Sequence, residues 1–431
     1  MNSTPLPITD LSNARRLVKQ HGPDLRFSHA WNKWLVWDGR RWKLDDTGEV
    51  MRRAKATARS IYQEATAASN ARDRMHLENW AVRSESASRL AAMVKLAESE
   101  ADTPVVPEKL DSNPWTLNVQ NGTVDLKSGQ LLPHDPHDLM TKLAPVDFDS
   151  NAGCPIWMQF LDRVMDGNQA KVDYLQRMVG YSLTGDTSEH VLTVLHGNGR
   201  NGKSTFLETI MSILGDYAAK APPGLLMAKV NEVHPTERAM LRGIRFSPAI
   251  ETTEGRHLDE VMVKELTGGD TVVARRMRED FWQFEPTHHL WIATNHRPII
   301  SGTDLGFWSR IKLVSFDVTI PEDERDKQLA EKLQTEFPGI LAWAVRGCLE
   351  WHRTGLQEPK EVLESTAAYR NTMDVLGDFL ADVCVIAPDA TVPKGEFYDA
   401  YLRWGKANGE HPLSKIDFGQ RLQERGLTDK R

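Results

Sequence analysis

Residues 191–205 read VLTVLHGNGRNGKST. A β-branched apolar run leads into a loop of small residues, and the loop leads into a segment with helical spacing. Gly197, Gly202, Lys203 and Ser204 match the spacing G-x-x-x-x-G-K-[ST] of a phosphate-binding loop. Glycines let the backbone curl, so that successive N–H groups point at phosphate oxygens beside the positive end of the helix. The stretch therefore predicts a nucleotide site.

The nucleotide-binding residues are expected to be the whole loop and the first helical residues: Gly197, Asn198, Gly199, Arg200, Asn201, Gly202, Lys203, Ser204 and Thr205. Lys203 would contact the β- and γ-phosphates of ATP, and the Ser204 hydroxyl would bind Mg²⁺. The alternative, a chance glycine-rich turn before a helix, is disfavoured by the apolar strand that precedes it.

Composition sets the outer bounds. The chain has 431 residues, which is too long for one typical domain, and a net charge of −7, which argues mildly against a protein coated in nucleic acid. A local basic surface remains compatible with that charge. No apolar run is long enough to span a membrane, and no signal peptide is recognisable. The three cysteines lie far apart without a C-x-x-C pair, which favours reduced thiols in a cytoplasm, that of a bacterial host.

The first hundred residues suggest an aromatic module followed by helices. Tryptophans and two turn signals, Asp38-Gly39 and Thr47-Gly48, predict a hairpin module within residues 8–50. Its tryptophans could stack on bases beside Arg40, Arg41 and Lys43, although a tryptophan-rich core is the favoured alternative. Residues 51–97 predict two helices with nine basic and four acidic residues. A DNA-facing collar and a solvated helix face explain this charge equally well.

The next segment combines strands and helices. Residues 102–114 read as a proline-containing linker, and residues 115–126 predict two short strands about the turn Asn121-Gly122. Residues 156–181 have helical apolar spacing.

An acidic residue follows the next predicted strand. Residues 245–250 read as a strand that ends at Glu251, and Glu254 lies three residues further on. A carboxylate in this place would bind Mg²⁺, and a second one would polarise the attacking water. Pro248 conflicts with a central strand, because proline cannot donate to the ladder.

A basic hairpin is predicted beyond this strand. Two β-prone runs, 271–276 and 281–284, flank a polar turn. Arg275, Arg276 and Arg278 near its tip would suit phosphate contacts, whereas the alternative is an edge hairpin protected by charge.

Two further polar residues stand at strand ends. The apolar run 289–294 ends at Asn295, whose amide could sense the γ-phosphate. Arg310 precedes the predicted strand 311–316 and could be delivered in trans to a neighbouring subunit's γ-phosphate.

In this order the motifs resemble the superfamily 3 helicases of the AAA+ class, and most closely the helicase half of phage- and plasmid-encoded primase-helicases, including the poxvirus type. The resemblance rests on the segments 197–205, 251–255, 264–270 with Ala274-Arg275, 291–295 and 306–310. Upstream, residues 117–122 and 180–185 look like the N-terminal helical domain of that family. The resemblance covers residues 10–320.

The resemblance implies a homohexameric ring that hydrolyses ATP and translocates on single-stranded DNA at forks, usually 3′→5′. It carries over Lys203 and Ser204 for phosphate and Mg²⁺, Glu251 as the Walker B acid, Asn295 as sensor and Arg310 as arginine finger. Lys264, Arg275 and Arg276 match the region that contacts DNA inside the channel. Ser309 stands where a basic residue is common, which leaves Arg310 as the single finger.

The expected fold class is α/β. An AAA+ P-loop core with a parallel sheet (186–322) would follow an N-terminal, mostly helical part made of an aromatic hairpin with basic helices (1–102) and a helical collar (103–185). A helical lid and a winged-helix-like tail (323–431) would complete the chain. No acidic triad suits primer synthesis, so a separate primase or polymerase is an expected partner. The tail lacks a clear wing strand, which suggests truncation.

The predicted function is an ATP-dependent ring helicase that serves replication of a phage, plasmid or other mobile element. One alternative is an ATP-dependent ring that only melts or marks an origin. Another is a small-molecule kinase, which would need neither an arginine in trans nor a basic hairpin.

Overall fold

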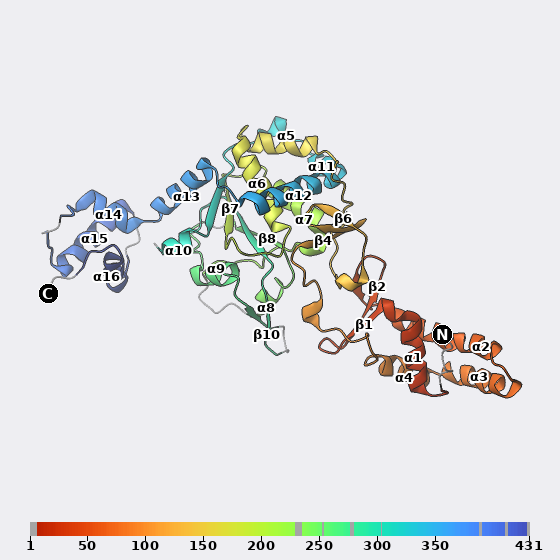
Figure 1. Cartoon of the computed structure of the whole chain (residues 1–431). Helices are drawn as coiled ribbons and strands as arrows, with labels where there is room; N and C mark the ends of the chain where they lie inside the picture. Colours follow the sequence, from red (N-terminus) through yellow and green to blue (C-terminus); the bar gives the residue numbers. More distant parts are fainter. Residues whose placement is uncertain are drawn as a thin grey trace.

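The computed structural model describes residues 7–228, 235–251, 254–275, 280–302, 304–387, 390–409 and 413–428. A central α/β body lies between an N-terminal part and a group of C-terminal helices, which extend to opposite sides of it (Figure 1).

The body is built on a four-stranded parallel sheet in the order β12-β7-β11-β8. Its strands are β7 (Leu192–His196), β8 (Phe246–Glu251), β11 (His289–Thr294) and β12 (Ile311–Ser315). The register pairs Thr294 with both His196 and Glu251, so that the ends of these strands meet at one edge. The predicted parallel sheet is confirmed, and each of the four predicted strands is present.

Each face of the sheet packs on a separate core. In β11, Trp291 and Ala293 belong to one cluster, while Leu290 and Ile292 belong to the other. The first core contains residues of α5 (Pro155–Val164), α6 (Gln169–Ser182), α7 (Lys203–Leu214), α11 (Leu329–Thr335) and α12 (Phe337–Thr354). The second contains residues of α9 (Glu260–Thr267), α10 (Leu305–Trp308) and α13 (Lys360–Thr372). Burial on both faces explains why these strands are apolar throughout.

Pro248 occupies the outer edge of this sheet. Its carbonyl accepts a hydrogen bond from Ala221 N (2.9 Å) outside the sheet, while its register partner in β11 is Trp291. Within a strand, the N–H and C=O of one residue point to the same side, so the missing N–H faces away from β11. The proline therefore removes no bond to β11, and the conflict noted in the sequence is resolved.

The segment before the body contains a three-stranded antiparallel sheet. Its strands are β4 (Thr116–Val119), β5 (Gly122–Asp125) and β6 (Gln130–Leu132). The hairpin at Asn121-Gly122 is confirmed, and β6 is an additional strand. Leu117 and Val124 belong to the same core as α7, so the predicted border at residue 185 does not coincide with a gap in the packing.

The N-terminal part contains four helices and a strand meander. They are α1 (Asp10–His21), β1 (Leu25–Ser28), β2 (Lys33–Trp37), β3 (Trp42–Leu44), α2 (Glu49–Thr66), α3 (Ala71–Ser84) and α4 (Ala87–Ala97). The prediction of two helices over 51–97 is wrong, because the segment is broken twice and forms three: Asn70 caps α3 by accepting a hydrogen bond from Asp73 N, and Ser86 is the N-cap residue of α4. Gly48 precedes α2 at φ +74° instead of forming a hairpin turn.

The tryptophans of this part form a core. Trp42 is buried beside Leu35, with Trp31 and Trp37 packed against the same cluster. The favoured alternative of the sequence analysis, a tryptophan-rich core, is therefore confirmed.

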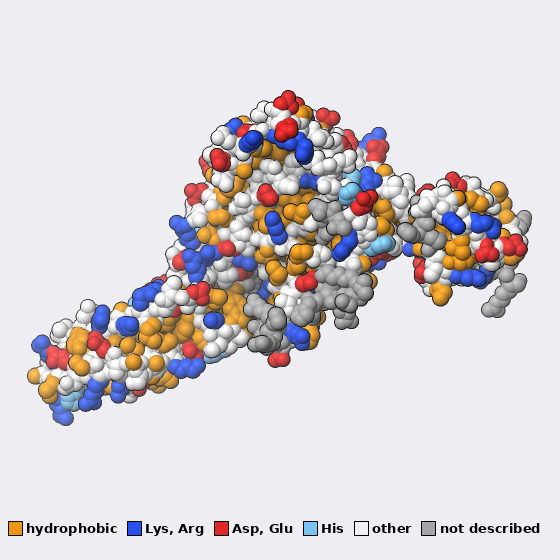
Figure 2. Space-filling view, turned by 180° about the vertical axis from the view of Figure 1, so that it is seen from behind, with side chains coloured by type: hydrophobic (Ala, Val, Ile, Leu, Met, Phe, Trp, Pro, Cys, Tyr) orange, Lys and Arg blue, Asp and Glu red, His pale blue; other side chains and the backbone are white. Residues whose placement is uncertain are grey.

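Most basic side chains of the N-terminal helices have acidic partners. Ion pairs join Arg53 to Asp24 and Glu49, Arg74 to Glu78 and Lys95 to Glu98. In the view of Figure 2, Lys and Arg are interspersed with acidic and hydrophobic side chains on this part. These pairs favour solvated helix faces over a continuous basic collar.

The C-terminal helices α14 (Val375–Val383), α15 (Lys394–Asn408) and α16 (Lys415–Glu424) surround a small core around Phe379 and Tyr401. Among the described residues from 375 onward there is no strand. Within the described ranges, no helix combines the length and apolarity needed to cross a membrane.

Candidate nucleotide site and nucleic-acid interface

The loop between β7 and α7 has the curled backbone that its glycines predict. Gly199, Arg200 and Gly202 have φ of +92°, +55° and +88°. Left-handed residues of this kind turn successive N–H groups toward one point, which suits an anion. At Gly197, an added Cβ would lie 2.3 Å from the carbonyl oxygen of Phe316, so only glycine fits there.

Lys203 is buried in this loop with 5% of its surface exposed. Its Nζ donates to the Gly197 carbonyl (2.5 Å), to Asn201 Oδ1 (3.1 Å) and to Asn295 Oδ1 (3.2 Å). Burial lowers the pKa of Lys203 to about 8. These three partners are neutral, and none of the described side chains offers Lys203 a carboxylate. Burying a charge without a counter-charge is costly, so a phosphate here would supply what the loop lacks.

The other loop residues divide into buried and exposed ones. Asn201 is buried and donates to the Phe316 carbonyl (3.1 Å), which ties the loop to the end of β12. Asn198, Arg200 and Ser204 are exposed, and Thr205 is half-buried. Ser204 lies in the first turn of α7, where the helix dipole favours anions and where its hydroxyl is accessible to a metal.

The two acidic candidates differ in position. Glu251 ends β8 in register with Thr294, and β11 lies between β8 and the loop's own strand, β7. Its backbone position suits a Mg²⁺ ligand, together with Ser204. Glu254 is 82% exposed, and its Oε1 lies 4.0 Å from His296 Nδ1. Bound Mg²⁺ would supply charge neutralisation for the phosphates.

Asn295 is the sensor candidate that the structure brings to the loop, because it follows β11 and accepts the bond from Lys203. His196 and Arg297, which had no predicted role, lie near this end of the strands. The pKa of His196 is lowered mainly by burial, and further by the positive charges of Arg297 and Lys203. His196 immediately precedes the loop, which is the one sequence signal that could have marked it.

Arg310 and the loop lie at opposite ends of the strands of the sheet. Arg310 precedes Ile311, whose register partner Leu192 begins β7, whereas the loop follows the end of that strand. Five residues of strand separate the two edges by about 16 Å. Arg310 Nη1 donates to the carbonyl (3.2 Å) and the hydroxyl (3.1 Å) of Thr267, the last residue of α9. In this chain it caps a helix, and it does not reach its own loop.

The predicted basic hairpin is present as β9 (Val272–Ala274) and β10 (Trp282–Phe284), beside α8 (Pro235–Ala239). It follows α9 and precedes β11, so it is attached at the same edge as Arg310. Arg275 lies over the Phe281 ring (4.8 Å), and Lys264 forms an ion pair with Asp304 (2.6 Å). Arg276 and Arg278 lie outside the described residues.

The parallel sheet, with helices packed on both of its faces, defines an α/β protein that carries a glycine loop between β7 and α7. Three family models match the chain: "D5 N terminal like" at residues 14–166, a family of unknown function at 195–310 and "Poxvirus D5 protein-like" at 371–425. The first and third of these matches confirm the resemblance to the poxvirus-type family.

Curated relatives come from large DNA viruses. A protein of Acanthamoeba polyphaga mimivirus, named as a candidate helicase, is 27% identical over 78% of this chain and 38% of its own length. One from African swine fever virus, named as a candidate primase, is 23% identical over 70% of this chain and 34% of its own length. The chain thus spans less than two fifths of these relatives.

A solved apo structure of the C-terminal region of NrS-1 shares the fold, with a TM-score of 0.50 and 11% sequence identity. The match covers 97% of this chain and 87% of that one.

Proposed function

We propose that the chain is an ATP-dependent DNA helicase that assembles as a hexameric ring and moves along single-stranded DNA during replication of a mobile element. Helicase and primase names among the viral relatives support a role in replication. ATP and Mg²⁺ are the proposed cofactors.

The contact between Lys203 and Asn295 carries this proposal. Lys203 belongs to the loop and Asn295 to the neighbouring strand, so one ammonium joins the phosphate-binding element to the candidate sensor (3.2 Å). A γ-phosphate bound at Lys203 would lie within reach of the Asn295 amide. Loss of that phosphate on hydrolysis would change what Asn295 contacts, and such a change at a strand end can be transmitted through the sheet.

The position of Arg310 supports the proposed hexameric ring. Its place at the far edge of the sheet separates it from its own loop, so an action on γ-phosphate requires the loop of a neighbouring subunit. Its planar, permanently charged group suits the charge that develops during phosphoryl transfer. The hairpin at the same edge is likewise separated from the nucleotide of its own chain, which suits a role in holding DNA.

Displacement of a labelled strand from forked DNA tests the proposal. The wild-type protein with ATP and Mg²⁺ should displace it, and Lys203→Ala should be slower by about 10²–10³-fold or more, because one essential electrostatic contact is lost. Lys332→Ala is the matched control, since this exposed lysine on α11 pairs only with Asp326 among the described side chains. Equal rates for Lys203→Ala and the control would refute the proposal.

A further inference from the structure

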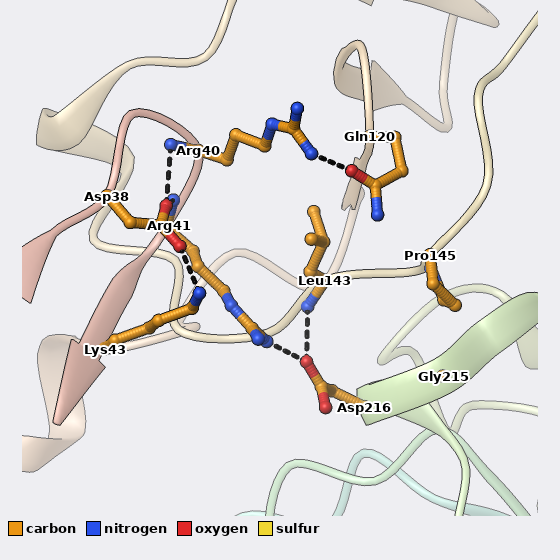
Figure 3. Close-up of a pocket in the computed structure, with 9 residues that line it drawn as sticks. All are labelled: Asp38, Arg40, Arg41, Lys43, Gln120, Leu143, Pro145, Gly215 and Asp216. Carbon is orange, nitrogen blue, oxygen red and sulfur yellow. Dashed lines mark hydrogen bonds and ion pairs between the residues drawn. The ribbon is translucent and has the colours of Figure 1, made fainter. Parts of the chain in front are cut away.

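A cavity of about 540 Å³ lies at the end of α7 that is remote from the loop (Figure 3). It is lined by Asp38, Arg40, Arg41, Lys43, Gln120, Leu143, Pro145, Gly215 and Asp216. Because α7 has 12 residues, the cavity is about 18 Å from the nucleotide site and is a separate feature.

The turn between β2 and β3 presents cationic side chains to this cavity. Asp38 Oδ1 accepts hydrogen bonds from the backbone N–H groups of Arg40 and Arg41 (2.9 Å each), and Oδ2 accepts one from Lys43 Nζ (2.7 Å). Asp38 thus holds the turn together. In Figure 3, Arg40 and Arg41 extend from the turn toward the opposite wall.

Charge in the cavity is incompletely balanced. Arg41 pairs with Asp216, but Arg40 meets only the neutral carboxamide of Gln120 among the described side chains. The lining has three cations against two carboxylates, in a chain whose net charge is −7. The cavity therefore carries a net positive charge in a protein whose net charge is negative, and a positive cavity attracts anions.

The cavity and the β9–β10 hairpin lie at the same edge of the sheet. Tyr217, next to Asp216, accepts a hydrogen bond from Arg245 N (2.7 Å), and Arg245 immediately precedes β8. The guanidinium of Arg242 lies 5.4 Å from the Trp31 ring and 5.1 Å from the Trp282 ring. These contacts join the N-terminal part to the end of β10 that lies next to the hairpin's turn.

We propose that the Arg40–Arg41–Lys43 turn binds phosphates of a nucleic-acid strand, on the same edge as the hairpin and independently of base sequence. This inference goes beyond the proposed function and rests on it for the identity of the ligand. The N-terminal part would then bind the strand in addition to the β9–β10 hairpin.

The lining favours phosphate over bases. It contains no aromatic side chain, because Trp37 and Trp42 pack into the N-terminal core. Lys43 and Asp216 are about half exposed, at 52% and 47% of their side-chain surface, so the cavity opens to solvent. A phosphate could take the place of Asp216 at Arg41, since a guanidinium group binds carboxylates and phosphates alike.

Fluorescence anisotropy of labelled oligo(dT), with the full chain and without ATP, tests this. In Arg40→Ala/Lys43→Ala, two lost phosphate contacts should lower the slope of log K against log[salt] by about 1.4, which corresponds to about 25-fold weaker binding at ~0.1 M salt. Arg74→Ala/Lys95→Ala is the matched control, because it removes two exposed, ion-paired charges from the same N-terminal part. It should retain the wild-type slope.

Three results would overturn the proposal: a wild-type slope in the Arg40/Lys43 variant, an equal loss in the control, or displacement of oligo(dT) by inorganic phosphate beyond that by chloride at equal ionic strength. The last would assign the cavity to free phosphate. The same measurement in a Lys203→Ala background separates the two proposals. Active hydrolysis by Lys203→Ala refutes the proposed function alone, whereas an unchanged salt slope refutes the cavity alone.

Discussion

Two adjacent buried histidines should make the body sensitive to acid. His288 and His289 are 3% and 5% exposed, and their Nε2 atoms bond to the carbonyls of Leu266 (3.0 Å) and Thr184 (3.1 Å). Burial lowers the pKa of His288 to about 4 and that of His289 to about 3.

The direction of the effect follows from linkage. Both groups are neutral in the folded state at a pH where the unfolded state, with a pKa of about 6.5, takes up protons. Above about pH 6.5 the two histidines do not lower the free energy of unfolding. Below that pH the free energy of unfolding falls, until the pH reaches the pKa values of the folded state. Between about pH 7.5 and pH 5 each histidine should lower the free energy of unfolding by about 2 kcal/mol, so that the two together lower it by about 4 kcal/mol.

Urea unfolding at a series of pH values, for the wild type and for His288→Gln/His289→Gln, measures this. Titrating groups common to both proteins cancel in the difference, so the free energy of unfolding of the wild type should fall by about 4 kcal/mol more than that of the variant. Parallel pH profiles would refute the reasoning.

Three further predictions concern the loop, the thiols and the ring. Gly202→Ala should lower the free energy of unfolding by about 1–3 kcal/mol in a urea titration, since φ is +88° and the new Cβ would lie 2.6 Å from Val164 Cγ1; an unchanged midpoint would contradict this. In the native protein a thiol reagent should modify the half-buried Cys384 first, because Cys154 and Cys348 are buried and burial, which raises the pKa of all three thiols, raises theirs to about 11 and about 12; rapid reaction of all three would exclude it. Mixed Arg310→Ala and Lys203→Ala proteins should regain part of the ATPase activity that each lacks, and an inactive mixture with verified subunit exchange would rule out action in trans.

The body was predictable because its signals are local. The four apolar runs predict strands, and the glycine spacing of residues 197–205 predicts a curled loop, without knowledge of the residues that pack around them. Helix α1, which lies in the segment predicted as a hairpin module, was not predictable, because it buries polar groups that conceal its periodicity. Asn13 bonds to Ser84 and Trp80, and Arg16 pairs with Glu64.

The candidate site residues could be proposed from the sequence, but the contacts between them could not. Lys203 and Asn295 could each be assigned a role, whereas their bond depends on which strand lies beside β7. His196 has no motif of its own, and its pKa is lowered by burial and then by the charge of Arg297, about a hundred positions away in sequence. The position of Arg310 at the far edge follows from strand register, which a single sequence does not specify.

The rate of ATP hydrolysis with and without single-stranded DNA tests the central proposal most directly. The proposed function predicts hydrolysis that rises when oligo(dT) is added and that Lys203→Ala abolishes. Hydrolysis that is indifferent to DNA, or that survives in Lys203→Ala, would contradict it.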